Sequence, residues 1–145
     1  MIHLEPITPD NWRLGLQVRE DQARFVAERA VILARAYAYR DSRSQALIVY
    51  DDEVPVGMVM YHDWDEERCY DFSQFFIDRR YQGKGFGYEA AKLVLERLKE
   101  DGKYDKVCLC YIEGDDAARR LYEKLGFRHT GVVEEDEIVM ELRLR

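Results

Sequence analysis

A glycine-rich loop carries the clearest chemical signal in the sequence. The run QGKGFG, residues 82–87, lies between an apolar, strand-like segment (residues 75–78) and a helical segment (residues 88–100). Glycines at alternate positions let a loop present successive backbone N–H groups, and the dipole of the following helix adds positive potential at the same point. The run therefore predicts a binding site for an anion such as a phosphate group.

Two better-known glycine motifs fit this run badly. The dinucleotide-binding fingerprint needs its third glycine one place later, and the phosphate-binding GxxxxGK[ST] loop is absent. Glycines also cluster in plain turns, so the loop alone leaves that interpretation open. The flanking residues favour the anion site.

The spacing Gln82-x-x-Gly85-x-Gly87 after a strand resembles the pyrophosphate-binding signature Q/R-x-x-G-x-G/A of the GNAT acetyltransferases. Further along, ARRLYEKLGF (residues 118–127) resembles the second signature of that family, A-x-x-L-Y-x-K-x-G-F. Within the family, FFIDRRYQGKG together with a short helical N-terminal half is similar to bacterial spermine/spermidine acetyltransferases. The resemblance spans nearly the whole chain and is sharpest over residues 71–127.

The resemblance implies acetyl-CoA as the cosubstrate and no metal. In this family the strand before the glycine loop and its parallel neighbour splay apart, and the pantetheine arm of acetyl-CoA lies in the gap. Backbone groups at the strand end would bind that arm, loop amides would hold the pyrophosphate, and two lysines would add charged contacts to the phosphates. The implied binding residues are Phe76, Ile77, Asp78, Gln82, Gly83, Lys84, Gly85, Phe86, Gly87, Asp115 and Lys124.

Asp115 departs from the family pattern. Three residues before the alanine of the second signature, the family commonly carries an asparagine that hydrogen-bonds the pantetheine or substrate region. A carboxylate cannot donate that hydrogen bond. Asp115 is expected to cap the helix that follows or to anchor a substrate ammonium.

Acetyl transfer to an amine needs a group that takes a proton from the nucleophile. A primary amine with a pKa near 10.4 is about 99.9% protonated at pH 7.4, so freeing its lone pair costs roughly 4 kcal/mol. Asp71 is the first candidate base, because it precedes Gln82 by the interval at which the histone-acetylating GNAT branch carries its glutamate. Glu113, at the end of the next predicted strand, is the second. An exposed or paired strand carboxylate is the alternative for both.

Tyr122, within the second signature, is the expected general acid for the leaving thiolate. The ordinary pKa of a phenol, near 10, lies close enough to that of an alkyl thiol for proton transfer. Backbone N–H groups near Phe76 or Ile77 would hold the oxyanion of the tetrahedral intermediate. An aromatic side chain at such a helix position otherwise serves packing alone, and the surrounding signature favours the catalytic interpretation.

The 145 residues suit one domain, residues 1–145, with 47% hydrophobic and 35% charged residues. The net charge of −7 argues against nucleic acid or an anionic membrane as partner, and acidic runs at 51–53, 63–67 and 134–137 favour a cationic substrate. The N-terminus does not resemble a signal peptide and no apolar run has membrane-spanning length, so a cytoplasmic location is expected. Reduced thiols in the core are expected for three cysteines without metal-ligand spacing, Cys69, Cys108 and Cys110.

The hydrophobic pattern predicts a mixed α/β fold. Strands are expected over residues 2–7, 46–50, 54–62, 68–78, 106–112, 127–133 and 138–144, and helices from residues 8–10 onward and over residues 22–39, 88–100 and 116–125. Strand 106–112 follows a helix, so it is expected to lie parallel to strand 68–78. The resemblance implies the GNAT fold, a central mixed, mostly antiparallel sheet of about six to seven strands with about four helices and a splayed parallel pair at the cosubstrate site.

These observations predict an acetyl-CoA-dependent N-acetyltransferase that acts on a small polycation, with spermidine or spermine as the leading substrate. An aminoglycoside, another amine or a protein N-terminus is the alternative acceptor. A non-catalytic acyl-CoA-binding or regulatory domain would keep the glycine loop but could lose the acid and base, and the presence of Tyr122 favours an enzyme. Family members often dimerise through edge strands, so the sequence is compatible with a homodimer.

Overall fold

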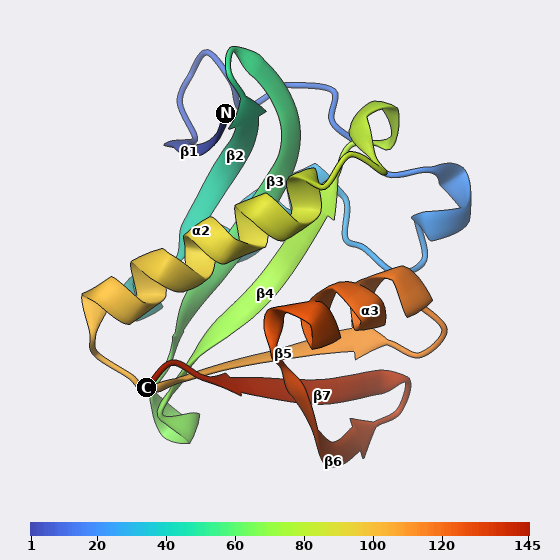
Figure 1. Ribbon diagram of the computed structural model, residues 1–145. Helices are drawn as coiled ribbons and strands as arrows, with labels where there is room; N and C mark the ends of the chain where they lie inside the picture. The colour runs from blue at the N-terminus through green and yellow to red at the C-terminus, as the bar shows by residue number, and fades with distance from the viewer.

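The computed structural model describes residues 1–145 and contains one seven-stranded sheet with the strand order β1-β2-β3-β4-β5-β7-β6 (Figure 1). Neighbouring strands pair antiparallel except β4 and β5, which are parallel. This arrangement confirms the predicted mixed α/β fold and the parallel pair. The elements are β1 (Ile2–Pro6), α1 (Arg29–Ala38), β2 (Gln45–Asp51), β3 (Val54–Trp64), β4 (Cys69–Ile77), α2 (Phe86–Asp101), β5 (Lys106–Ile112), α3 (Asp116–Leu125), β6 (Arg128–Glu134) and β7 (Glu137–Arg143), with short 3₁₀ helices between several of them.

The N-terminal part differs from the prediction. No helix begins at residues 8–10, because the side chain of Asn11 closes a turn instead: it accepts a hydrogen bond from the Thr8 amide (2.7 Å) and donates one to the Pro6 carbonyl (2.9 Å). The predicted helix 22–39 is also shorter, since α1 begins only at Arg29 after an extended Glu28. The chain therefore has three α-helices rather than about four.

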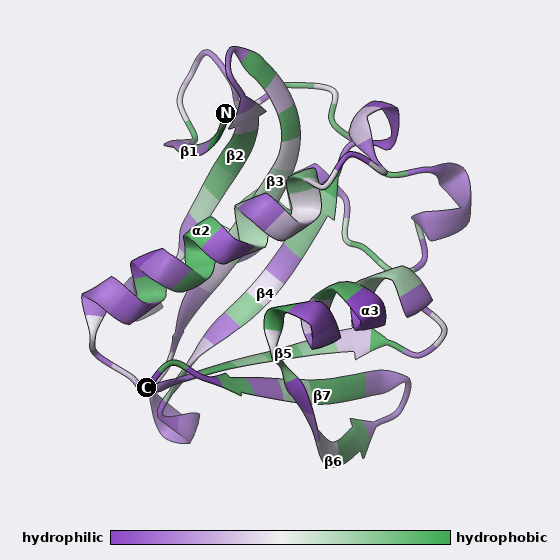
Figure 2. Ribbon diagram, in the orientation of Figure 1, coloured by the Kyte–Doolittle hydropathy of each residue, from purple (hydrophilic) through white to green (hydrophobic).

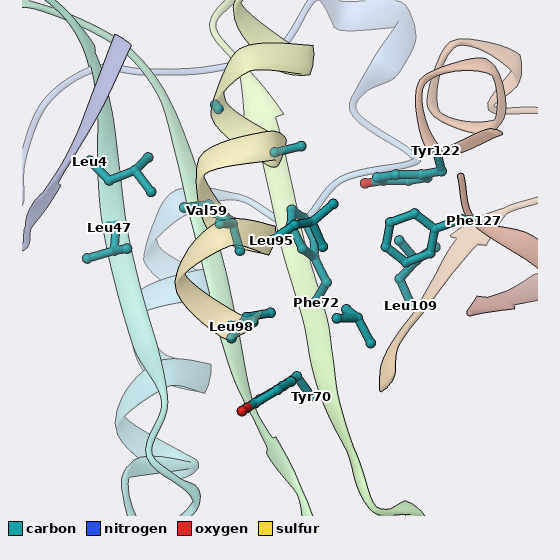
Figure 3. Close-up of a cluster of buried hydrophobic side chains, with 14 of the residues drawn as sticks. Leu4, Leu47, Val59, Tyr70, Phe72, Leu95, Leu98, Leu109, Tyr122 and Phe127 are labelled. Atoms are coloured by element: carbon teal, nitrogen blue, oxygen red, sulfur yellow. The ribbon is translucent and has the colours of Figure 1, made fainter. Parts of the chain in front are cut away.

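The helices cover the two faces of the sheet unequally. Helices α2 and α3 lie on one face of the sheet (Figure 1). Helix α1 packs against β2 and β3 on the other face. The larger apolar core lies under α2 and α3 and includes Phe72, Leu95 and Tyr122 (Figure 3). A smaller core under α1 is centred on Ile32 and Met60. Helices α2 and α3 direct hydrophilic residues away from the sheet (Figure 2).

Strands β4 and β5 begin side by side and then diverge (Figure 1). Their ladder contains only two pairs, Tyr70 with Val107 and Asp71 with Cys108. Beyond Asp71, β4 keeps its antiparallel partner β3 but has no strand on its other side. The splayed parallel pair predicted for the fold is therefore present.

A polar cluster ties the C-terminal end of α2 to the paired end of this gap. Arg43 donates to the buried carboxylate of Asp63 (2.6 Å) and to Asp101 at the end of α2 (3.0 Å). Lys103 also contacts Asp63 (2.8 Å), and the Tyr70 hydroxyl donates to Asp101 (2.5 Å). The cluster fixes the direction of α2 across the sheet and hence the position of its N-terminus. None of the helices combines the length and apolar character needed to cross a membrane.

Candidate active site

The glycine loop leads directly into the N-terminus of α2. Gly83 and Gly85 adopt left-handed backbone conformations, with φ of +79° and +83°, which favour glycine. Gly85 is the residue that precedes the first turn of α2. The first amides of an α-helix have no partner within the helix, so this loop and helix end together offer N–H groups and positive potential to an anion.

The side chain of Gln82 joins this loop to two other segments. Its amide nitrogen donates to the Ile77 carbonyl at the end of β4 (2.9 Å) and to the side-chain oxygen of Gln22 (2.9 Å). Gln22 belongs to the segment that precedes α1. Gln82 therefore holds the strand end, the glycine loop and the N-terminal segment in one arrangement.

Asp78 stabilises the same region through hydrogen bonds to its carboxylate. Its fully buried carboxylate accepts hydrogen bonds from the amide of Gln17 (2.9 Å), the amide of Arg80 (3.0 Å) and the Arg80 guanidinium (2.8 Å). Burial opposes its charge, but these donors outweigh burial and hold the pKa of Asp78 below its usual range. The backbone groups of Asp78 are also used, since its amide donates to Val56 (2.7 Å) and its carbonyl accepts from Tyr81 (2.9 Å).

A cavity of about 260 Å³ opens between the glycine loop, the end of β4 and the start of α3. Most of its lining residues belong to, or directly neighbour in the sequence, the residues predicted for the site. Its walls include Phe75, Phe76, Ile77, Gln82, Gly83, Gly85, Phe86, Gly87, Asp115 and Tyr122, together with Val18, Gln22 and Val26 from the N-terminal segment. The N-terminal contribution has no recognisable sequence motif, because that segment is irregular and reaches the cavity only through the fold.

Tyr122 lies on the wall formed by α3. Its ring packs edge-on against Phe72 and Phe127, and its hydroxyl is directed toward β4 and α2 (Figure 3). Burial raises the pKa of Tyr122 above the ordinary value of a phenol, and the nearby Asp115 carboxylate adds to the effect. The side chain is therefore held in its protonated form, which has a proton available for transfer.

Asp115 caps α3 and borders the same cavity. Its carboxylate accepts from the Ala118 amide (3.2 Å), which confirms the expected helix cap. Burial raises the pKa of Asp115. An ammonium or amide donor entering the cavity would find this carboxylate at its wall.

Five of the predicted residues do not line the cavity: Asp71, Asp78, Lys84, Glu113 and Lys124. Lys84 is exposed on the glycine loop, and the Lys124 ammonium lies 4.5 Å from the centre of the Tyr88 ring. Glu113 is exposed in the turn after β5, where its amide donates to the Asp136 carbonyl (2.7 Å).

Asp71 occupies the point where β4 and β5 separate, on the sheet face opposite α2 and α3. Its carboxylate lies 3.2 Å from Nε2 of His62, its cross-strand partner on β3. Sequence reasoning missed His62. The register of the β3–β4 hairpin was the available signal, because it places these two residues opposite each other.

The three cysteines are free thiols, as predicted. Cys69 and Cys108 are buried, but Cys110 is exposed, so the expectation that all three pack in the core is wrong. The reason is that Cys110 points to the sheet face that no helix covers at β5. No group of three or more His, Cys, Asp or Glu side chains is arranged to hold a metal ion.

Comparison with known proteins places the chain in a family. The model of the Acetyltransferase (GNAT) family matches residues 10–127. The chain is 31% identical over 137 residues to the spermine/spermidine N(1)-acetyltransferase of Bacillus subtilis, which covers 90% of each chain. It is 34% identical over 76 residues to the N-acetylaspartate synthetase of Homo sapiens, a match to 52% of this chain and 25% of that protein.

The fold has a close counterpart among solved structures. The spermidine N-acetyltransferase of Vibrio cholerae, in complex with CoA and spermine, superposes with a TM-score of 0.79 over 99% of this chain and 95% of that chain, at 20% identity. This likeness confirms the predicted GNAT fold. Because the family model matches most of the chain, the protein belongs to the acetyltransferase (GNAT) family.

Proposed function

We propose that the protein transfers the acetyl group of acetyl-CoA to a primary amine of a polyamine such as spermidine or spermine. One observation carries the proposal: a single cavity is lined by the glycine loop at the N-terminus of α2, by the end of β4 from which β5 has diverged, and by Tyr122 on α3. A pyrophosphate and an extended acyl-pantetheine arm need this combination of a phosphate cradle and a strand without a neighbour.

Backbone groups at the end of β4 that have no partner strand are suited to bind acetyl-CoA. Because β5 has left β4 beyond Asp71, alternate N–H and C=O groups of β4 up to Ile77 lack a strand partner on that side. Those near Phe76 and Ile77 would bind the pantetheine arm and hold the oxyanion. Asp78 is left out of this set, because its backbone groups are occupied. The amides of residues 82–87 would hold the pyrophosphate, and Lys84 and Lys124 would add charge from the rim.

Proton transfer would involve both faces of the gap. Tyr122 faces the cavity and would protonate the leaving thiolate, and Asp71 at the start of the gap would take the proton of the amine. Neither carboxylate lines the cavity, and Glu113 is the weaker candidate because it lies in an exposed turn. Asp115 at the cavity wall would attract an ammonium group.

The net charge of the protein and its sequence similarity to known enzymes support a polyamine as the acetyl acceptor. The net charge of −7 favours a polycation, and a relative matched over 90% of the chain is a spermine/spermidine N(1)-acetyltransferase. A cytoplasmic location agrees with three free thiols. Association through the exposed edge strand β6 would give a homodimer.

The test is release of free CoA from acetyl-CoA over a panel of polyamines, diamines, monoamines, aminoglycosides and peptides. We expect spermidine or spermine to give the highest kcat/KM. A higher kcat/KM for a peptide or a neutral acceptor would refute the polyamine assignment and keep the acetyltransferase. Binding of acetyl-CoA with no turnover of any amine would instead support a non-catalytic acyl-CoA-binding domain.

A further inference from the structure

The side chains of His62 and Asp71 form a close pair at the part of the sheet where β4 and β5 separate. His62 Nε2 lies 3.2 Å from Oδ2 of Asp71, and His62 Nδ1 lies 2.7 Å from the backbone carbonyl of Asp63. The imidazole stacks on Tyr39, with 4.4 Å between ring centres and 15° between planes. The side chain of His62 is 7% exposed and that of Asp71 is 28% exposed, so Asp71 is the member that an entering molecule can reach.

The partners of the imidazole fix its protons. A carbonyl oxygen can only accept, so Nδ1 must carry a hydrogen. Nε2 then faces a carboxylate, which also can only accept, and a hydrogen bond between them requires a second proton. Without that proton two acceptors face each other. The pair is therefore built to take up one proton on Nε2.

We infer that the pair of His62 and Asp71, rather than Asp71 alone, is the proton acceptor of the transfer reaction. This inference rests on the proposed function and assigns its base. Proton transfer from an amine of pKa about 10.4 to a free aspartate of pKa about 3.9 is unfavourable by about 10⁶·⁵-fold. Transfer to an imidazole of pKa about 6.5 is unfavourable by only about 10⁴-fold, an improvement of about 400-fold. Asp71 receives the proton and His62 retains it.

Some groups around the imidazole raise the pKa of His62 and others lower it. Burial and the positive charge of Arg35 on α1 oppose a protonated His62, whereas the hydrogen bonds to Asp71 and to the Asp63 carbonyl favour it. Tyr39 stacks on the ring, and Cys108 and Cys110 of β5 lie near Asp71. The balance raises the pKa of His62 above its ordinary 6.5, toward the range in which a general base works near neutral pH.

The protons of the reaction balance with this assignment. The ammonium gives one proton through Asp71 to His62 Nε2, and its lone pair forms the C–N bond at the thioester carbonyl. The C–S bond then breaks, and Tyr122 gives its proton to the thiolate. The second proton of the nitrogen restores Tyr122. The proton on His62 leaves to solvent through Asp71, so each turnover of a protonated amine releases one proton.

The first test uses the unaltered protein. Nitrogen NMR of the histidine rings should show neutral His62 with its hydrogen on Nδ1 and a pKa above 6.5, and Asp71→Asn should lower that pKa. A hydrogen on Nε2 in the neutral form, or a pKa at or below 6.5, would overturn the inference without any variant that affects folding or catalysis.

The second test separates proton acceptance from positioning. His62→Gln keeps a side-chain N–H that can donate to Asp71 but cannot accept a proton, so kcat with spermidine should fall by about 100-fold. The acidic limb of the kcat profile should move from the NMR pKa of His62 toward the carboxylate range near pH 4. His129→Gln is the matched control, because His129 contacts the Tyr111 hydroxyl (2.7 Å) instead, and it should leave both unchanged.

Two outcomes distinguish the inference from the proposed function. If His62→Gln keeps the wild-type kcat and acidic limb, the inference is wrong, and the wild-type activity still supports an acetyltransferase. If the wild-type protein acetylates no amine, the proposed function fails and the inference fails with it.

Discussion

Asp78 is predicted to contribute strongly to the free energy of unfolding of the protein. Asp78→Ala removes the acceptor of two backbone N–H groups, those of Gln17 and Arg80, in a position where the carboxylate is fully buried. Each unsatisfied buried N–H costs about 1–3 kcal/mol, so we expect a loss of about 3 kcal/mol in the free energy of unfolding. With an m-value of about 2 kcal/mol/M, the urea midpoint should fall by about 1.5 M.

The pH dependence of the same contribution can be measured with Asp78→Asn. The folded pKa of Asp78 is lowered, so its charge stabilises the fold fully above the unfolded pKa of about 3.9 and progressively less as the pH falls through the folded pKa. The difference in urea midpoint between wild type and Asp78→Asn should therefore be constant near pH 7 and narrow below about pH 4. Asp10→Ala, in an exposed turn, is the matched control and should change the midpoint little.

Two results would refute this reasoning. One is an Asp78→Ala midpoint within about 0.3 M of the wild type, which would mean that the two amides find water or other partners. The other is a difference between wild type and Asp78→Asn that widens as the pH falls below 4, because that sign belongs to a group with a raised pKa.

Three further predictions concern binding and catalysis. Gly85→Asp should abolish acetyl-CoA binding by calorimetry, since it brings a negative charge to the phosphate cradle, whereas Gly131→Asp, also at positive φ with open space around it, should bind normally; unchanged affinity in folded Gly85→Asp would contradict the cradle. Tyr122→Phe should keep acetyl-CoA affinity and lower kcat by about ten- to a thousandfold, while the equally buried Tyr111→Phe should not; undiminished turnover would leave Tyr122 a packing residue. The KM for spermidine should rise from 0.1 M to 1 M salt, as the Debye length shortens from about 10 Å to about 3 Å, and rise less for a monoamine of similar length; indifference to salt would contradict electrostatic recruitment.

The sequence predicted the elements whose cause is local. Helix α2 follows from the glycine loop before it, the apolar stripe along it and Gly102 after it, whose left-handed conformation ends the helix. The hairpin of β2 and β3 follows from alternating apolar residues around the turn at 51–53. These signals agree with the tertiary structure, so prediction and structure coincide.

The N-terminal segment was mispredicted because local side-chain hydrogen bonds and tertiary contacts together override its helical pattern. Asn11 bonds to backbone groups of residues on the strand side, which competes with helix formation. The side chain of Gln22 accepts a hydrogen bond from Gln82. The ring of Phe25 lies beside Gly114, 3.9 Å from the point that a Cβ atom would occupy there. Residues 14–28 therefore follow the rim of the cavity rather than a helix axis.

The candidate site was predictable where a motif names its residues and not where the fold brings them. The glycine loop, Asp115 and Tyr122 were found from two signatures and share one cavity. His62 was not found, because a lone histidine in a strand has no motif and acquires its partner only through the register of β3 and β4. The same reason hides the structural role of Asp78, which was predicted as a binding residue but whose buried carboxylate accepts from the distant Gln17 amide.

The location of acetyl-CoA is the central claim, and backbone amide NMR during a titration with acetyl-CoA tests it most directly. We expect saturable shifts that are largest for the amides of residues 83–88 and for those of residues 117–122 at the facing wall. A second cavity, lined by Arg43, Arg97 and Asp101 at the other end of α2, provides an internal comparison and should show little change. Shifts confined to that second cavity, or no saturable shifts at the glycine loop, would contradict the account.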